Sequence, residues 1–440
     1  MSTISRFHIT QEKLCMILFA FILLSRASIT TEFNYVPLNT TAVQTFYSLS
    51  MLGLYVSKKI STKKIGTMHW STALSALLII YIILFGAIFV NPPLAQYTNG
   101  ILLRQMLFLM IVFSTVSVTV AYRLFDKMLL TAFYTFSFIL FFQFATHITD
   151  LGLLNPLTVF SDSSRVRADY GFSHYNALGA FCACHIIIWM ILKARHLIPF
   201  KHNILNVIVL LISVLMLLGS ASRNAISSLI VYAICYGFMS LKETPNRRYF
   251  KLLLECLLLL FLFVFFVAGA SNIPLTDLLN QSNRETLFEV ALPTFFSSTR
   301  TMIGLGLASN EIYGMNLTPY PTYWLDNSYV YVLVTTGFIG IILYILMILV
   351  LFIGLRHVQL RAMRKHTISL TIMCLYSALF ETTLFWAGVM QNYVYLLILL
   401  VAISGYFNNQ YSNIFQNQLR RQYDNERRHH RYDDFPCVPQ

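Results

Sequence analysis

The chain has 440 residues, of which 57% are hydrophobic and only 11% are charged, and its mean hydropathy is +0.65. A soluble globular domain carries about 25% charged residues, so this composition excludes a soluble protein. Apolar runs such as LIIYIILFGAIFV do not alternate with period two, which excludes the strands of a membrane barrel. The net charge of +13 does not indicate nucleic-acid binding, because the basic residues cluster in short loops between apolar runs.

The apolar runs predict an all-α polytopic membrane protein with about twelve transmembrane helices. In chain order, the predicted spans are residues 14–31, 41–57, 70–90, 101–121, 128–146, 174–192, 203–219, 223–241, 251–270, 328–354, 367–387 and 389–407. We predict a single transmembrane domain over residues 1–415 and a polar cytoplasmic tail over residues 416–440. The first span resembles a signal peptide interrupted by Arg26, but no clear cleavage site accompanies it, so we expect it to be retained.

The distribution of lysine and arginine predicts the orientation of these helices. With the N-terminus inside, 24 of the 31 basic residues lie on the cytoplasmic side, as do both ends of the chain. All eleven lysines fall inside, and the seven outward basic residues are Arg26, Arg104, Arg165, Arg167, Arg223, Arg284 and Arg300. Since only arginine offers a planar fork that binds phosphate bidentately, this asymmetry predicts a phosphate-bearing ligand on the outer face. The excess of arginine over lysine in the whole chain is the alternative explanation.

Two outward loops, residues 147–173 and 271–327, are much longer than the other connections. Long loops in compact proteins are commonly functional. We therefore expect these two loops, with the short outward turn GSASRNA, to form the active-site region.

The cysteine, histidine and aspartate residues do not indicate a binding site for a metal or another cofactor. At least five of the seven cysteines lie inside apolar runs, and no Cys–His pattern has the spacing of a zinc site. Asp162 and Asp169 in the first outer loop stand seven residues apart, which is not the spacing of a metal-binding Asp-x-Asp pair.

The first outer loop ends in SRVRADYGFSHYN, which supplies Arg165, Arg167, His174 and Asn176 as candidate ligands. One residue separates the two arginines, so a helix or a strand would turn them to different sides. We therefore expect only one of them to contact the ligand. His174 has an alternative interpretation as a hydrogen-bonding histidine of the membrane interface.

Three further arginines are candidates: Arg223 in GSASRN, Arg284 in NRET and Arg300 in SSTRT. Arg223 stands where two predicted spans meet, where Ser220, Ser222 and the N-terminus of the next helix would support a bound anion. The alternative for Arg223 is an interfacial arginine that extends to the lipid headgroups.

Asp326 and Asn327 stand directly before a long apolar span, so they are either helix N-caps or polar groups that face the outer cavity. In the second case the Asp326 carboxylate could accept a proton from a sugar hydroxyl. Glu381 lies near the outer end of another span, where an ionisable side chain is either functional or paired with an arginine.

These motifs occur in a fixed order: an arginine before G-F-x-H-x-N, then S-x-S-R, then an arginine-bearing outer loop ending near G-x-G, then D-N-S-Y with G-F-I-G. In this order they resemble the O-antigen polymerase and ligase superfamily of bacterial membrane proteins. The chain most resembles the Wzy-type polymerases of capsule, exopolysaccharide and O-antigen assembly. The residues that carry the resemblance are Arg165 or Arg167, Gly171, Phe172, His174, Asn176, Ser220, Arg223, Arg284, Gly304, Gly306, Asp326, Asn327, Gly337 and Gly340.

The chain departs from the family pattern at two positions. Tyr175 stands where proline is frequent, and Asp326 stands where the ligases typically carry histidine. The second departure favours a polymerase over a ligase.

The resemblance implies a GT-C-like membrane glycosyltransferase that needs no metal and acts at the outer face of a bacterial cytoplasmic membrane. Its substrates would be oligosaccharides linked to undecaprenyl pyrophosphate, and the growing glycan would be transferred to the sugar of a new lipid-linked repeat unit. Besides membrane lipid, the implied partners are a chain-length regulator and a flippase of the same pathway.

We hypothesise that Arg223 and Arg284, with Arg165 or Arg167, hold the pyrophosphate, whose negative charge grows as the glycosidic bond breaks. Asp326 is the predicted catalytic base. The residues predicted to position the substrate are His174, Asn176, Asn327, Arg300 and Glu381.

Two alternatives remain open from the sequence. The first is a ligase-like enzyme, which moves a finished glycan to a different acceptor. The second is a flippase or another transporter of lipid-linked oligosaccharides, which is disfavoured because the charges lie at the outer rim rather than near the bilayer midplane.

Overall fold

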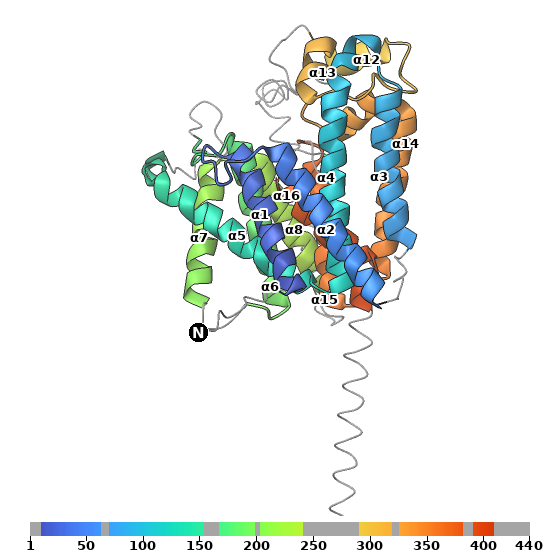
Figure 1. Cartoon of the computed structure of the whole chain (residues 1–440). Coiled ribbons are helices and arrows are strands. Elements are labelled where there is room, and N and C mark those ends of the chain that lie inside the picture. Colours follow the sequence, from blue (N-terminus) through green and yellow to red (C-terminus); the bar gives the residue numbers. More distant parts are fainter. Residues whose placement is uncertain are drawn as a thin grey trace, which may run out of the picture.

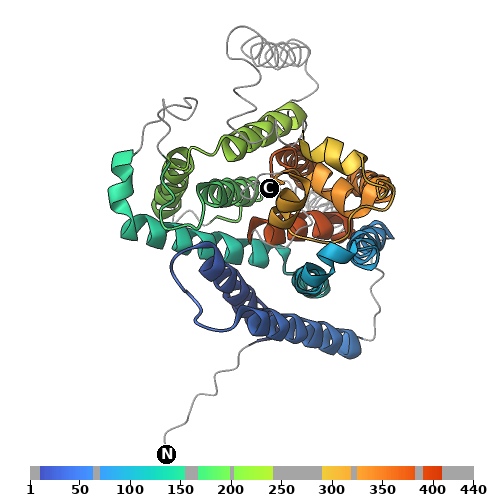
Figure 2. The ribbon, with the colours of Figure 1, turned by 90° about the horizontal axis from the view of Figure 1, so that it is seen from above.

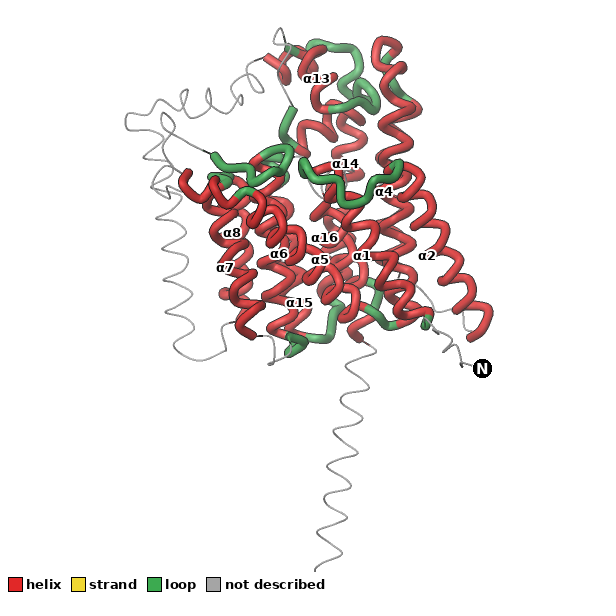
Figure 3. The backbone as a smooth tube through the Cα atoms, turned by 60° about the vertical axis from the view of Figure 1, so that its left-hand side comes forward, coloured by secondary structure: helices red, strands yellow, loops and turns green. Residues whose placement is uncertain are grey.

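The computed structural model describes residues 10–62, 70–153, 167–198, 203–240, 290–318, 325–381 and 390–408. Within these ranges the regular structure is helical, with a single isolated β-bridge between Thr31 and Phe172. The helices run up and down a bundle, and Figure 3 shows loops at its lower end and at more than one level of its upper half.

Six of the described helices are long and apolar enough to cross a membrane, which supports a polytopic membrane protein. They are α1 (Gln11–Thr30), α3 (Trp70–Ile88), α4 (Ala95–Tyr122), α5 (Phe125–Thr146), α6 (Tyr175–Ala194) and α14 (Ser328–Arg356). The other α-helices are α2 (Thr40–Thr62), α7 (Asn203–Gly219), α8 (Arg223–Ser240), α12 (Leu292–Phe296), α13 (Asn310–Leu317), α15 (Arg361–Ser377) and α16 (Met390–Ile403) (Figure 1). Two short 3-10 helices, η1 (Pro92–Leu94) and η2 (Ile148–Leu153), lie in the connections.

Eleven of the twelve predicted spans fall on described helices, and the span at 251–270 lies outside the described residues. The largest difference concerns the span predicted at 367–387, because α15 ends at Ser377, ten residues before the predicted end, and the chain turns there. The helix also begins at Arg361, six residues before the predicted start. The hydropathy pattern misses this first turn because the turn is basic, with Arg361, Arg364 and Lys365. The prediction of twelve membrane-spanning helices in a GT-C-like arrangement stays a prediction, and the tail at 416–440 lies outside the described residues.

The core of the bundle is built around α16. Every residue of α16 is buried, and the helix contacts α1, α3, α4, α6, α14 and α15. Closely packed pairs surround it: α2 with α4, α3 with α14, and α8 with α15. Seen from above (Figure 2), α1 and α2 lie along one edge of the molecule.

The helix α14 is broken near its beginning. Gly337 has φ 66° and ψ −164°, so the helical backbone is interrupted there and its hydrogen bonds need other partners. The chain after α12 supplies them: Leu305 N–H donates to the Val334 carbonyl (2.7 Å), and Phe338 N–H donates to the Thr301 carbonyl (3.1 Å).

Glycine is required where this loop meets the broken helix. A Cβ at Gly304 would lie 2.4 Å from the Thr335 carbonyl oxygen, and one at Gly337 would lie 2.3 Å from the Met302 carbonyl oxygen. Both glycines also have positive φ, which other residues adopt at a cost. The G-x-G and G-F-I-G motifs of the sequence are therefore the two sides of one close backbone contact.

Candidate functional site

A single short turn brings together the starts of three helices. This turn, which we call the Ser377–Glu381 turn, is residues 377–381 at the end of α15. Asn176 of α6 donates from Nδ2 to the Glu381 carboxylate (Oε1, 2.9 Å), across 205 residues of sequence. Asn224 of α8 donates from Nδ2 to the Ser377 hydroxyl (3.2 Å). The second residues of α6 and α8 are thus both bonded to this turn.

The start of α14 is bonded to the same turn at three points. Ser328 N–H donates to the Ala378 carbonyl (2.8 Å), and the Ser328 hydroxyl donates to the Glu381 carbonyl (2.7 Å). Asn327 donates from Nδ2 to the Leu379 carbonyl (2.9 Å). The N-termini of α6, α8 and α14 therefore lie together at one end of the bundle.

This convergence has an electrostatic consequence. Each helix N-terminus carries roughly half a positive charge from its unpaired N–H groups. Three N-termini at one place, two of them with an arginine at or close before the first residue, make a region suited to a bound anion. The arginines are Arg223, the first residue of α8, and Arg167, eight residues before α6, and both are partly buried.

Arg223 is held by a tight turn between α7 and α8. Ala221 in this turn has φ 46°, and a Cβ at Gly179 of α6 would lie 2.6 Å from the Ser222 Cβ, so α6 packs closely against the turn. The hydroxyl of Ser220 donates to the Leu217 carbonyl (2.7 Å), and both serines of the turn are buried. These serines form hydrogen bonds within the turn that holds Arg223, and their support of a bound anion stays a prediction.

Arg167 lies against an aromatic ring. Its guanidinium carbon is 3.9 Å from the centroid of the Tyr175 ring, a cation–π contact. Partial burial lowers the pKa of Arg167 from its ordinary value, but arginine stays charged in proteins. Tyr175, which replaces the frequent proline of the family pattern, is thus the residue that orients Arg167. Arg165 lies outside the described residues.

His174 is the N-cap of α6, so the structure assigns it a capping role at the site. Its Nδ1 accepts a hydrogen bond from Asn176 N–H (3.1 Å), which puts the proton of the neutral ring on Nε2. Partial burial and the nearby charge of Arg167 lower the pKa of His174 from its ordinary value of 6.5. At neutral pH the exposed imidazole therefore offers an uncharged Nε2–H donor.

The segment that carries Arg167 and His174 is fixed against the end of α1. Ser173 N–H donates to the Thr30 carbonyl (2.9 Å), and Glu32 N–H donates to the Gly171 carbonyl (2.7 Å). Gly171 has φ 73°, and a Cβ there would lie 2.6 Å from the Gln143 side-chain oxygen. The glycine of the G-F-x-H-x-N motif is needed for this close contact.

Asn327 and Asp326 occupy different environments. Asn327 is buried and caps α14: its Oδ1 accepts from the N–H groups of Tyr329 and Val330, both at 3.0 Å. The N-cap interpretation therefore holds for Asn327. Asp326 precedes it with an exposed side chain, so its carboxylate is accessible at the same end of the bundle.

The remaining predicted residues lie elsewhere or outside the described ranges. Arg300 donates from Nε to the Gly304 carbonyl (3.0 Å) and from Nη2 to the Phe89 carbonyl, so it binds the C-terminal end of α3, where a cation is favourable. Arg284 lies outside the described residues. Within the described ranges, no three His, Cys, Asp or Glu side chains come together as metal ligands.

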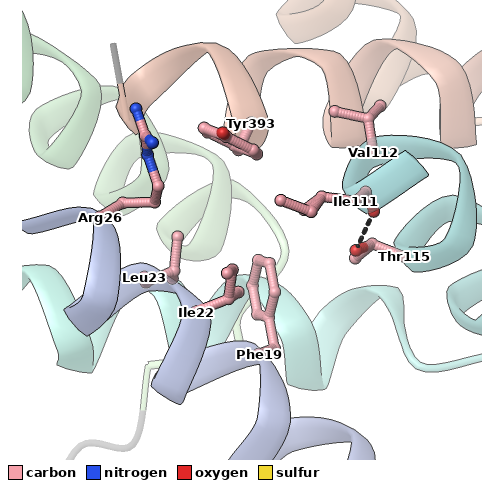
Figure 4. A pocket seen from close by; sticks show the side chains of 8 residues that line it. All are labelled: Phe19, Ile22, Leu23, Arg26, Ile111, Val112, Thr115 and Tyr393. Atoms are coloured by element: carbon pink, nitrogen blue, oxygen red, sulfur yellow. Dashed lines mark hydrogen bonds between the residues drawn. The ribbon is translucent and has the colours of Figure 1, made fainter. Parts of the chain in front are cut away.

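Arg26, another of the arginines predicted to lie outward, is buried in the core. It is 5% exposed and lies 5.5 Å from the centroid of the Tyr393 ring. Figure 4 shows it at the edge of a small cavity between α1, α4 and α16, whose lining is otherwise Phe19, Ile22, Leu23, Ile111, Val112, Thr115 and Tyr393. This cavity has room for about one water molecule, so it is too small for a sugar.

Residues 208–345 match the family model described as O-antigen ligase. The match covers about a third of the chain and includes Arg223, the G-x-G loop, Asp326 and the first part of α14 with its break at Gly337. It supports the resemblance to the O-antigen ligase and polymerase superfamily, whose members are glycan-transferring membrane enzymes, and does not distinguish polymerase from ligase. No curated protein matches the chain.

Sequence reasoning did not identify Asn224, Ser377 or Ser328 as members of the site. A partial signal was present, because an asparagine stands within two residues of the start of three predicted spans, in YNA, RNA and DNS. Asparagine is common near helix starts for local reasons, so the pattern alone gives no reason to expect a shared partner.

Proposed function

We propose that the protein is a Wzy-type polymerase of lipid-linked oligosaccharide repeat units. In this proposal it works at the outer face of a bacterial cytoplasmic membrane, with both chain ends in the cytoplasm. Its substrates are oligosaccharides linked to undecaprenyl pyrophosphate. The observation that carries the proposal is the convergence of three helix N-termini with Arg167, Arg223, His174 and Asp326 at the Ser377–Glu381 turn, in a chain that matches the O-antigen ligase family model.

The arrangement suits the departure of a pyrophosphate. In the transfer, a hydroxyl oxygen of the acceptor sugar forms a bond to the anomeric carbon of the growing glycan. The bond from that carbon to the pyrophosphate oxygen breaks, and its electron pair leaves with the pyrophosphate. Arg223 and Arg167, with the three helix N-termini, stabilise the negative charge that develops there. Arg284 and Arg165 are further proposed ligands of the same group.

The acceptor hydroxyl must lose a proton as it attacks. Asp326 is the proposed base, since its carboxylate is exposed beside the N-terminus of α14. The Nε2–H of His174 is a proposed donor to a phosphate or sugar oxygen, and Asn176, Asn327, Arg300 and Glu381 are proposed to position the substrate, directly or through the protein groups they bind. These steps use the chain's own side chains and backbone.

Ligation is the second candidate, favoured by the description of the matching family model. Transport is less well supported. A broken helix is a common feature of transporter binding sites, and α14 has one. However, backbone groups freed at Gly337 are bonded to the loop at 301–305, so they are not available to bind a transported solute.

Deletion of the gene in its host separates these functions. Loss of a polymerase leaves glycans of a single repeat unit at the cell surface, whereas loss of a ligase leaves polymer on its lipid carrier. Loss of a flippase leaves single units on the cytoplasmic side. Single units on the outer side, restored to polymer by the wild-type gene and not by R223K, would support the proposal. Polymer retained on the lipid carrier would replace it with ligation.

A further inference from the structure

The hydrogen bond between Asn176 and Glu381 joins parts of the chain that the sequence separates by 205 residues. Glu381 ends the Ser377–Glu381 turn, and its side chain is partly buried. Its carboxylate oxygen accepts from Asn176 (2.9 Å), and its backbone carbonyl accepts from the Ser328 hydroxyl (2.7 Å). Glu381 therefore bonds to the starts of both α6 and α14.

We propose that Glu381 and Asn176 are a positioning pair, in which the carboxylate fixes the first turn of α6 and so sets the places of Arg167 and His174. The inference rests on the proposed function, because it assigns Glu381 a part in the same site. It deepens that function by giving the two carboxylates different roles. Asp326 accepts the proton of the acceptor hydroxyl, and Glu381 fixes the first turn of α6.

The contacts of α6 explain how the effect reaches the ligand. Asn176 is the second residue of α6, and its own N–H donates to Nδ1 of His174 (3.1 Å). Tyr175 lies between these two residues in the sequence, and its ring makes the cation–π contact with the guanidinium of Arg167. A shift of Asn176 would thus move the imidazole and the cation–π contact together.

The charge of Glu381 fits an anchoring role. Its side chain accepts a hydrogen bond from the start of α6, and its backbone accepts one from the start of α14. Hydrogen bonds to an ionised acceptor are about twice as strong as neutral ones. Within the described residues, the other charged side chains and the histidine at or just before the starts of α6, α8 and α14 are Asp326, His174, Arg167 and Arg223.

The test exchanges the two chemical groups across the hydrogen bond. The variants are Glu381→Ala, Glu381→Gln, Asn176→Asp and the double variant Asn176→Asp with Glu381→Gln. In Glu381→Gln the amide oxygen can still accept from Asn176, whereas Asn176→Asp brings two carboxylates together. In the double variant the amide introduced at position 381 donates to the carboxylate introduced at position 176, so the bond is restored with its groups exchanged.

We expect Glu381→Ala and Asn176→Asp each to lower kcat about tenfold or more, since each removes the hydrogen bond that holds α6 to the turn. Glu381→Gln should lose much less, and the double variant should recover most of the activity lost in Asn176→Asp. The acidic side of the pH–rate profile should keep its shape in Glu381→Gln. Asn316→Asp is the matched control, because Asn316 is exposed and bonds the Ile312 carbonyl of its own helix.

The opposite pattern would overturn the inference. If Glu381→Gln is as inactive as Glu381→Ala and the double variant shows no recovery, then Glu381 itself contacts substrate or transfers a proton. Loss of the acidic side of the profile in Glu381→Gln would mean the same.

Failure of the proposed function gives a different result, in which the wild-type protein makes no polymer from lipid-linked repeat units. The positioning pair is then tested by thermal unfolding of the same variants in detergent. The inference requires a lower Tm in Asn176→Asp and its recovery in the double variant. An unrecovered Tm would show that the pair does not hold α6 to the turn.

Discussion

At the scale of single residues, the site depends on what each polar side chain already contacts. Asn327 and Arg300 bond to backbone groups at helix ends, at the start of α14 and the end of α3. Arg223 and Arg167 instead lie at the end of the bundle where three helices begin. Their chemistry differs from that of lysine, because the guanidinium fork can bind two phosphate oxygens at once.

Replacing Arg223 by lysine tests this fork directly. Arg223→Lys keeps the charge and loses the bidentate geometry, so we expect kcat to fall by about tenfold to a hundredfold. The measurement is the rate of chain elongation on a defined lipid-linked repeat unit. Arg104→Lys is the control, since Arg104 is an exposed residue of α4. Equal activity of Arg223→Lys and the wild type would contradict the pyrophosphate role of Arg223.

His174 gives a prediction for pH. Its pKa is lowered in the folded protein, so the neutral form is favoured there and the unfolded chain takes up a proton first as the pH falls. The stability from this group is therefore complete above the ordinary pKa of 6.5 and is lost as the pH drops below it. The Tm of the wild type should fall over this range more steeply than that of His174→Asn, whose side chain still caps α6 without titrating. Parallel Tm curves for the two proteins would show that His174 titrates normally.

At the scale of elements, the break in α14 and the loop that fills it form one unit. The loop at 301–307 and the helix exchange backbone hydrogen bonds at Leu305 and Phe338, and Gly304 and Gly337 stand at close contacts between the two backbones. The sequence shows the glycines, but the reason for them lies in a contact between segments that are about thirty residues apart. The same holds for the asparagines of α6 and α8, whose partners are on a turn far along the chain.

Gly304→Ala should disrupt this unit. The added Cβ would lie 2.4 Å from the Thr335 carbonyl oxygen, and the alanine would have to adopt a φ of 78°. We therefore expect the free energy of unfolding to fall by about 2 kcal/mol or more. The check is the Tm in detergent together with the yield of folded protein. Gly53→Ala in α2 is the matched control, because no atom lies within 4 Å of its added Cβ. A Gly304→Ala protein as stable as the control would show that the loop does not pack on α14 as described.

At the scale of the whole molecule, composition and hydropathy were enough to predict the helices. Eleven predicted spans fall on described helices because each apolar run must be buried in lipid or protein as a helix. The sequence does not predict which helices contact one another, because one apolar helix surface can pack against any other. The candidate site was predicted in part. Arg223, His174, Asn176 and Asp326 lie at or next to the starts of helices that meet, and Arg167 contacts Tyr175 at the start of α6. Arg300 binds the end of α3, and Arg165 and Arg284 lie outside the described residues.

The orientation in the membrane is a separate prediction at this scale. Leu379 is exposed on the Ser377–Glu381 turn, and His357 is exposed at the opposite end of α14 and α15. In intact cells, a thiol reagent that cannot cross the membrane should label Leu379→Cys and leave His357→Cys unlabelled until the cells are opened. All but one of the described native cysteines are buried, which keeps their own labelling low. If His357→Cys is labelled in intact cells and Leu379→Cys is not, the site faces the cytoplasm. A lipid-linked donor at the outer face could then not bind to it.

Incubation of the purified protein with one defined undecaprenyl-pyrophosphate-linked repeat unit, followed by sizing of the products, tests the proposed polymerase most directly. We predict a ladder of glycans that differ by whole repeat units and remain attached to the lipid, with no added metal required. The ladder should be lost in Asp326→Asn and strongly reduced in Arg223→Lys. Single repeat units that stay unchanged in the presence of folded wild-type protein would contradict the account.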